Sequence, residues 1–137
     1  MTDFQLDQKL AADTVEVDRW GLNLVLLMDD ANYPWLILVP ARPGLRDFHD
    51  LAPADLPAMT AEIVRASKSL EALFEPVKLN VAALGNQVPQ LHVHVLARRE
   101  DDPAWPKPAW GAAPARPYGD AARAERIASL REAFARF

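Results

Sequence analysis

The sequence predicts an α+β fold, with an antiparallel sheet of about five strands, one long covering helix, and a C-terminal arm and helix. Short apolar runs separated by turn residues predict the strands, and one long segment with apolar residues at helical spacing predicts the covering helix. Strands and helices are segregated along the chain, which is typical of an antiparallel sheet with helices packed against it.

Two strands are expected at residues 22–30 and 35–41, which are rich in leucine and valine. The turn residues of the sequence ANYP separate them, and because this connection is short, an antiparallel hairpin is the simplest pairing. Pro40 stands near the end of the second run and lacks a backbone N–H group. That strand is therefore expected to lie at an edge of the sheet, or to end at the proline.

A long amphipathic helix is expected from about Pro53 to Phe74. Its apolar residues recur at helical spacing, charged residues occupy the other face, and Pro76 ends it. The apolar stripe predicts that this helix covers one face of the sheet. The residues of the stripe are Leu56, Met59, Ile63, Leu70 and Leu73.

Two further strands are expected at residues 78–84 and 90–98, with a loop between them that contains Gly85. Residues 103–119 then hold five of the twelve prolines, so an extended arm is expected there rather than a regular element. A final helix is expected from Asp120, because apolar residues again recur at helical spacing.

The length of 137 residues predicts one domain, 1–137, with its core in about residues 1–102 and the arm and last helix in about residues 103–137. The net charge of −4 and the lack of a basic cluster argue against a nucleic-acid partner. The chain has no cysteine, which excludes disulfides, thiol nucleophiles and thiolate metal sites. The sequence shows neither a signal peptide nor an apolar run of membrane-spanning length, so we expect a cytoplasmic protein without a membrane partner.

The sequence QLHVHV places Gln90, His92 and His94 at alternate positions of the last expected strand before the arm. Side chains alternate between the two faces of a strand, so these three polar groups are expected to share one face. The apolar residues between them share the other face and can pack beneath the long helix. They are Leu91, Val93 and Val95.

The residues alone leave three roles open for the two histidines. They can lie on a solvated strand face without a function. They can bind a metal ion, because rings two residues apart reach one ion, although a third ligand would have to come from His49, a carboxylate or an amide. They can also act at phosphorus, because a neutral imidazole is a nucleophile near neutral pH and its neighbour can donate to a phosphate oxygen or to the leaving group.

The stretch NVAALGNQVPQLHVHVLAR resembles the signature of the histidine triad (HIT) family, in which Gly-Gln-Ser/Thr-Val precedes His-φ-His-φ-His-φ-φ, where φ is apolar. Upstream, LLMDDANYPWLILVPAR is similar to the family's succession of an aspartate, a turn, an apolar strand and Val-Pro. The resemblance covers roughly residues 20–99, with the long helix in the expected place between its two halves. It implies a HIT-like fold.

The resemblance also implies an activity. In the family, the middle histidine attacks the α-phosphorus of a nucleotide conjugate to form a nucleotidyl-histidine, and water then releases the nucleoside monophosphate. The resemblance assigns this attack to His92, and it assigns to His94 a contact with the phosphate that stabilises charge or protonates the leaving group. It therefore implies a nucleotide hydrolase or nucleotidyl transferase for dinucleoside polyphosphates or phosphoramidates, without a cofactor or metal, and usually a homodimer whose sheets join.

Five further residues match binding positions of the family, and the resemblance implies that they contact the substrate. Asp29 matches the acidic residue that holds the ribose hydroxyls, with Asp30 as the less favoured alternative. Asn80 matches an upstream amide residue. The remaining three are Gly85, which matches a glycine that approaches the phosphate, and Asn86 and Gln87, which replace the family's Gln-Ser/Thr pair.

The chain departs from the family pattern at the first histidine of the triad, which is Gln90 here. Glutamine can hold a hydrogen-bond network in the catalytic row but cannot carry a proton charge. This departure motivates a second hypothesis, a nucleotide-binding module with weak or vestigial catalysis. Arg42 and Pro43 replace a histidine that often follows the Val-Pro strand, and His49 is expected to be a surface residue rather than its substitute.

Four other side chains each have two open roles. Arg98 and Arg99 can attract a phosphate tail, since guanidinium suits phosphate geometry, or they can form a solvated strand end. Trp105 and Trp110 can stack on a nucleobase, or they can pack in the core or across a dimer interface.

Overall fold

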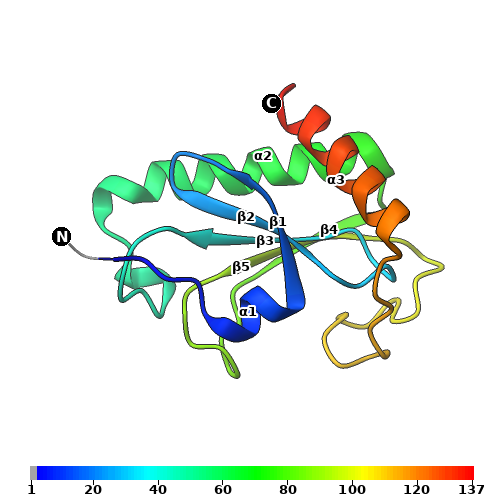
Figure 1. Cartoon of the computed structure of the whole chain (residues 1–137), viewed down its shortest axis with the longest axis horizontal. Helices are drawn as coiled ribbons and strands as arrows, with labels where there is room; N and C mark the ends of the chain where they lie inside the picture. The colour runs from blue at the N-terminus through cyan, green and yellow to red at the C-terminus, as the bar shows by residue number, and fades with distance from the viewer. Residues whose placement is uncertain (1–2) are drawn as a thin grey trace.

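The computed structural model describes residues 3–137, which form a five-stranded antiparallel sheet in the order β1-β2-β3-β5-β4 and three α-helices (Figure 1). The strands are β1 (Thr14–Arg19), β2 (Asn23–Met28), β3 (Trp35–Pro40), β4 (Lys78–Ala82) and β5 (Val93–Arg98). The α-helices are α1 (Gln8–Asp13), α2 (Leu56–Phe74) and α3 (Asp120–Phe134), and short 3₁₀ turns cover Phe48–Asp50 and Pro53–Asp55.

The predicted α+β fold is confirmed, with differences at the ends of the elements. All four expected strands form, each somewhat shorter than predicted. Pro40 ends β3, which lies in the middle of the sheet, so the proline marks a strand end and not an edge. The long helix begins at Leu56 after a 3₁₀ turn and ends at Phe74, because the C-cap residue Glu75 has a φ of 46° that breaks the helical path before Pro76.

Helices α2 and α3 cover one face of the sheet, as Figure 1 shows. Strand side chains at alternate positions meet the buried face of α2 there, at Met59 and Leu70. The prediction that the apolar residues of the histidine strand pack on this side is confirmed. The buried strand residues of this layer include Val25, Leu27, Leu36, Leu38, Leu91, Val93 and Val95.

The opposite face of the sheet is covered by α1 and by the arm that follows β5 (Figure 1). Leu10 of α1 and Ala104 and Ala109 of the arm are buried there against the strands. His92 and His94 belong to this second face, because they alternate with the residues that pack beneath α2. The fold thus places the two imidazoles between the sheet and two segments that lie far apart in the sequence.

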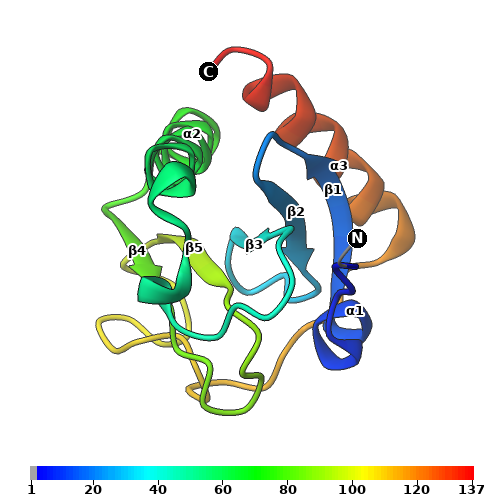
Figure 2. The ribbon, with the colours of Figure 1, turned by 90° about the vertical axis from the view of Figure 1, so that its left-hand side faces the viewer.

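The sheet has β1 and β4 at its two edges, and Figure 2 shows them on opposite sides of the molecule. β5 lies between β3 and β4, where His94 is level with Ile37 on one neighbour and Ala82 on the other. This inner position fixes the backbone of the histidine strand from both sides. Within residues 3–137 no helix combines the length and the apolar character needed to cross a membrane.

Candidate active site

His92 lies just before β5, is 6% exposed, and has one ring nitrogen engaged by the backbone. Its Nδ1 is 2.6 Å from the carbonyl oxygen of Gln90. A carbonyl oxygen can only accept, so Nδ1 carries the proton of this hydrogen bond. In the neutral ring the lone pair then resides on Nε2, the nitrogen that remains available to a ligand.

His94 is 5% exposed and is held in the opposite tautomer. The indole Nε1–H of Trp35 donates to its Nδ1 at 3.0 Å, so the proton of the neutral ring is on Nε2. Burial, together with the nearby charge of a protonated His92, lowers the pKa of His94 to about 3. Near neutral pH the ring is therefore an uncharged hydrogen-bond donor.

The two imidazoles meet edge to face, with ring centroids 4.9 Å apart, and line one cavity of about 360 Å³, here called the histidine cavity. This volume lies within the range of small-molecule sites. Because both rings are buried, the solvated strand face considered from the sequence is excluded. The apolar residues lining the cavity are Leu10, Met28, Trp35, Ile37, Leu84, Val88 and Trp110.

The loop before the histidine strand reaches the same cavity, where Gly85, Asn86 and Gln87 form part of its wall. Gly85 adopts φ of 76°, a left-handed conformation that residues with a side chain rarely adopt. A Cβ atom at this position would also lie 3.4 Å from the carbonyl oxygen of Val88. The structure therefore brings three of the predicted binding residues next to the two histidines.

Gln90 uses its side chain to hold the N-terminal segment. Its Oε1 accepts the backbone N–H of Asp7 at 2.8 Å, and its Nε2 donates to the backbone carbonyl of Gln5 at 2.8 Å. Gln90 lines a second cavity, of about 250 Å³, that adjoins the histidine cavity at Gly85 and His92. His49 also lines this second cavity, and its side chain is 85% exposed, as expected for a surface residue.

Asp29, Asp30 and Asn80 do not line the histidine cavity. The Oδ1 of Asp29 accepts the backbone N–H of Tyr118 at 2.9 Å, and the buried carboxylate of Asp30 accepts backbone N–H groups of its own turn and of the arm. The Oδ1 of Asn80 accepts from Arg98 at 2.8 Å. All three groups therefore have structural partners, and their role in substrate binding stays a prediction.

The structure adds three residues to the site that the sequence did not single out, because Lys9 and Asp13 of α1 and Trp35 of β3 line the histidine cavity. Trp110 of the arm, for which the sequence left two roles open, also lines the cavity and packs edge to face against His94 at 5.2 Å. No local signal marks the α1 residues, because a six-residue helix is too short to show a clear period.

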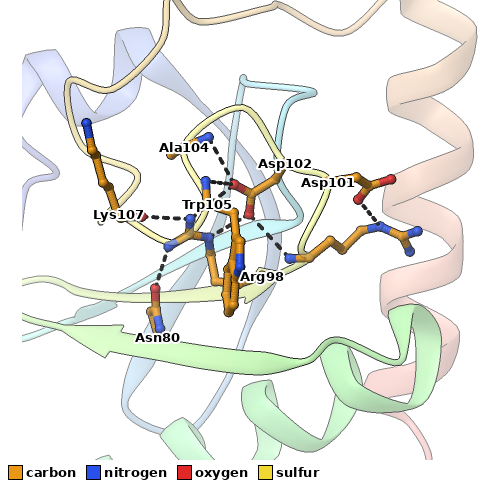
Figure 3. A network of polar contacts seen from close by, with 8 residues as sticks. Asn80, Arg98, Asp101, Asp102, Ala104, Trp105 and Lys107 are labelled. Carbon is orange, nitrogen blue, oxygen red and sulfur yellow. Dashed lines mark hydrogen bonds and ion pairs between the residues drawn. The ribbon is translucent and has the colours of Figure 1, made fainter.

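Arg98 is neither a solvated strand end nor a free phosphate ligand, so both roles considered from the sequence are wrong. It is 2% exposed, and its Nε and Nη2 donate to the carboxylate of Asp102 at 2.7 and 3.1 Å (Figure 3). Further hydrogen bonds reach the Oδ1 of Asn80 and the carbonyl oxygen of Lys107, and the guanidinium lies over the ring of Trp105 at 5.6 Å. Arg98 thus anchors the segment that carries Trp110 to the histidine cavity.

Asp102 is the acceptor at the centre of this network. Burial raises the pKa of its carboxyl, but hydrogen bonds from Arg98 and from the backbone of Arg99, Ala104 and Trp105 outweigh burial, so the pKa lies below its ordinary value. The hydrogen bonds of the folded protein therefore favour the carboxylate form of Asp102. Arg99, by contrast, pairs with Asp101 on the surface.

Within the described part of the chain, no three or more His, Asp or Glu side chains are grouped so as to hold a metal ion. His92 and His94 are adjacent, but Nδ1 of each ring is already engaged by a protein group.

A comparison with family models matches the HIT domain to residues 11–101, two thirds of the chain. The chain belongs to the histidine triad (HIT) family. Membership confirms the resemblance seen in the sequence and places the chain in a superfamily of nucleotide-binding hydrolases and transferases.

Solved structures of HIT proteins are similar over nearly the whole chain. A histidine triad protein from Bradyrhizobium japonicum is 41% identical over 97% of this chain and 99% of its own, with a TM-score of 0.95. One from Marinobacter aquaeolei is 41% identical over 98% of each chain, also with a TM-score of 0.95. One from Sinorhizobium meliloti is 40% identical over 94% of this chain and 96% of its own, with a TM-score of 0.92. No match was found among curated proteins.

The first prediction concerns the anchor of the arm. Arg98→Met leaves the carboxylate of Asp102 buried without its cation, so the free energy of unfolding should fall by about 3–5 kcal/mol in urea denaturation. Arg99→Met is the matched control, because its ion pair is exposed, and it should change the value by less than about 0.5 kcal/mol. Equal effects of the two substitutions would contradict the buried network.

The second prediction concerns the charge of His94. Its pKa is about 3 in the folded protein and near the ordinary 6.5 in the unfolded chain. Between these values the unfolded chain holds a proton that the folded protein lacks, so this ring lowers stability progressively as the pH falls from 6.5 towards 3. NMR of the ring nitrogens should show neutral His94 at pH 5 in the folded protein, and titration near 6.5 in urea. A midpoint near 6.5 in the folded protein would contradict the assignment.

Proposed function

We propose that this HIT protein is a nucleotide hydrolase or nucleotidyl transferase that cleaves the bond between the α-phosphate of a nucleoside monophosphate and its conjugated group. Dinucleoside polyphosphates and nucleoside phosphoramidates are the proposed substrates. The supporting observation is the hydrogen bond from Nδ1 of His92 to the carbonyl of Gln90, which leaves Nε2 as the free nitrogen in a cavity of suitable size.

In the proposed first step, the Nε2 lone pair of His92 forms a bond to the α-phosphorus while the bond from phosphorus to the leaving group breaks. A polyphosphate leaves as an anion, and an amine takes its proton from water. The imidazole ring becomes positively charged in this step, and the hydrogen bond from its Nδ1 to the Gln90 carbonyl stabilises that charge.

In the proposed second step, water attacks the same phosphorus, the bond to Nε2 breaks, and the nucleoside monophosphate leaves while a proton passes to solvent. A different acceptor in place of water would make the reaction a transfer. His94 contributes as a neutral donor, because its Nε2–H can bond a phosphate oxygen on which negative charge develops. The loop of Gly85, Asn86 and Gln87, which forms part of the cavity wall, would also bind the phosphate.

Gln90 at the first triad position favours a second candidate, a nucleotide-binding module with weak or vestigial catalysis. An amide cannot exchange a proton with the substrate, so any acid–base contribution of that position is lost. Binding of AMP without turnover of either substrate class would support this module and rule out the enzyme.

The third prediction tests the nucleophile. His92→Ala should lower the turnover of an adenosine phosphoramidate and of a dinucleoside polyphosphate on the order of 10³-fold or more, because no other group replaces the attacking nitrogen. Calorimetry with AMP is the control, and affinity should change only a few-fold. Turnover by the variant at the wild-type rate would contradict the mechanism.

We propose further that the protein is a homodimer joined through the edge strand β4. An edge strand presents unpaired backbone groups that a second copy can pair with. Three large apolar side chains in and beside β4 are exposed to solvent in the single chain. They are Val77, Val81 and Leu84. Pairing of two such edges would extend both sheets into one.

The fourth prediction tests this dimer. Sedimentation equilibrium of the wild-type protein should give twice the 15.2 kDa of one chain, and Val81→Lys should shift the mass towards 15.2 kDa, because a lysine opposes edge pairing. Phe137→Lys is the control, since it changes an equally exposed apolar residue at the end of the chain. A wild-type protein with the mass of one chain would contradict the proposal.

A further inference from the structure

A separate cavity, of about 320 Å³, lies between the end of α2 and the first half of α3, and is here called the helix cavity. It shares no lining residue with the histidine cavity. Figure 1 shows α2 and α3 together on the face of the sheet away from α1 and the arm. The helix cavity is therefore remote from the site of the proposed reaction.

The guanidinium of Arg126 lies in the wall of the helix cavity, over two aromatic rings. Its carbon Cζ is 4.6 Å from the ring centroid of Phe74 at the end of α2 and 5.5 Å from that of Tyr118 just before α3. Attraction between the cation and the two ring faces holds the group in place. The rings leave its in-plane N–H groups without acceptors.

Arg126 differs in this respect from the other arginines of the described chain that are at least partly buried. Arg98 and Arg123 donate to carboxylates, and Arg65 donates to a backbone carbonyl. Arg126 donates only to the hydroxyl of Tyr118, from Nη1 at 3.1 Å. Among residues 3–137, its Nε and Nη2 have no acceptor and it has no ion-pair partner.

The free edge of this guanidinium has a defined preference. The Nε–H and Nη2–H groups point the same way, and their spacing matches the two oxygens of a carboxylate. The hydroxyl of Tyr118 adds a third donor, because its oxygen accepts from Arg126 while its own proton remains available. Burial raises the pKa of this hydroxyl, so it keeps its proton at neutral pH.

The remaining lining residues restrict the ligand further. Leu73, Phe74 and Ala122 supply apolar contacts, which suit a ligand with an apolar group. Glu125 also lines the helix cavity, and its negative charge opposes a ligand with more than one negative charge. These surroundings favour a monoanionic carboxylate over a phosphate.

We propose that the helix cavity is a second ligand site, which binds a small monoanionic carboxylate with an apolar group through the free edge of Arg126 and the hydroxyl of Tyr118. The carboxylate accepts from both, and the apolar group packs against Leu73 and Phe74. The site is independent of the nucleotide chemistry proposed for His92.

The fifth prediction uses benzoate as the probe. Calorimetry of the full chain without nucleotide should show that benzoate binds at least about tenfold more tightly than benzamide, which has the same shape without the charge. Inorganic phosphate, which lacks the apolar group, should also bind at least about tenfold more weakly than benzoate. In NMR spectra, the amide shifts caused by benzoate should be centred on residues 73–74 and 118–129.

Substitutions test the contact with Arg126. Arg126→Met keeps the length of the side chain and should weaken benzoate binding about tenfold or more. Arg126→Lys keeps the charge but lacks the paired donors, so its affinity should be intermediate. Arg123→Met is the matched control, because Arg123 lies one turn earlier on α3 and pairs with Asp120 instead, and its affinity should equal that of the wild type.

A purely structural role of Arg126 would appear as a lower unfolding temperature of Arg126→Met with no binding of benzoate to the wild type. Five results would overturn the proposal: no binding to the wild type, equal binding of benzamide, equal binding of phosphate, unchanged affinity in Arg126→Met, or shifts centred on the histidine cavity. The comparison of benzoate with benzamide uses the wild type alone, so it holds even if a variant fails to fold.

Discussion

The hydrogen bond between Nδ1 of His92 and the carbonyl of Gln90 is the interaction on which the site depends. This hydrogen bond requires the backbone of Gln90 and the ring of His92 to keep a fixed distance and orientation just before β5. That strand is held in place by its pairing with β3 and β4. The bond sets the tautomer of the ring, and with it the nitrogen that can meet phosphorus. A strand free on one side would not hold this geometry as firmly.

Burial gives the second histidine a different character. His94 lies against Trp35 and Trp110, where a charged ring would be poorly solvated. The indole N–H of Trp35 donates a hydrogen bond to its Nδ1. The two imidazoles thus present different nitrogens in different roles, one with a free lone pair and one with a proton to share. Two segments from outside the core sheet complete this environment, α1 through Gln90 and the arm through Arg98 and Asp102.

The sequence was sufficient where the signal is local. Alternation placed His92 and His94 on one face, and helical spacing located the long helix that packs on the other. The sequence did not reveal the edge strand β1, because Glu16 and Asp18 interrupt the apolar residues of TVEVDR. The roles of Asp29 and Arg98 could not be read from the sequence either. Asp29 holds a backbone group 89 residues away, and Arg98 is buried only because the arm folds back over it.

The most direct test is to look for the bond between His92 and phosphorus. A reaction with an adenosine phosphoramidate, quenched within one turnover under conditions that preserve phosphorus–nitrogen bonds, can be digested and analysed by mass spectrometry. The account predicts an adenylyl group on the peptide that contains His92, attached at the imidazole, and its disappearance as AMP forms. Formation of AMP with no modified peptide at any time, or with the group on another residue, would contradict it.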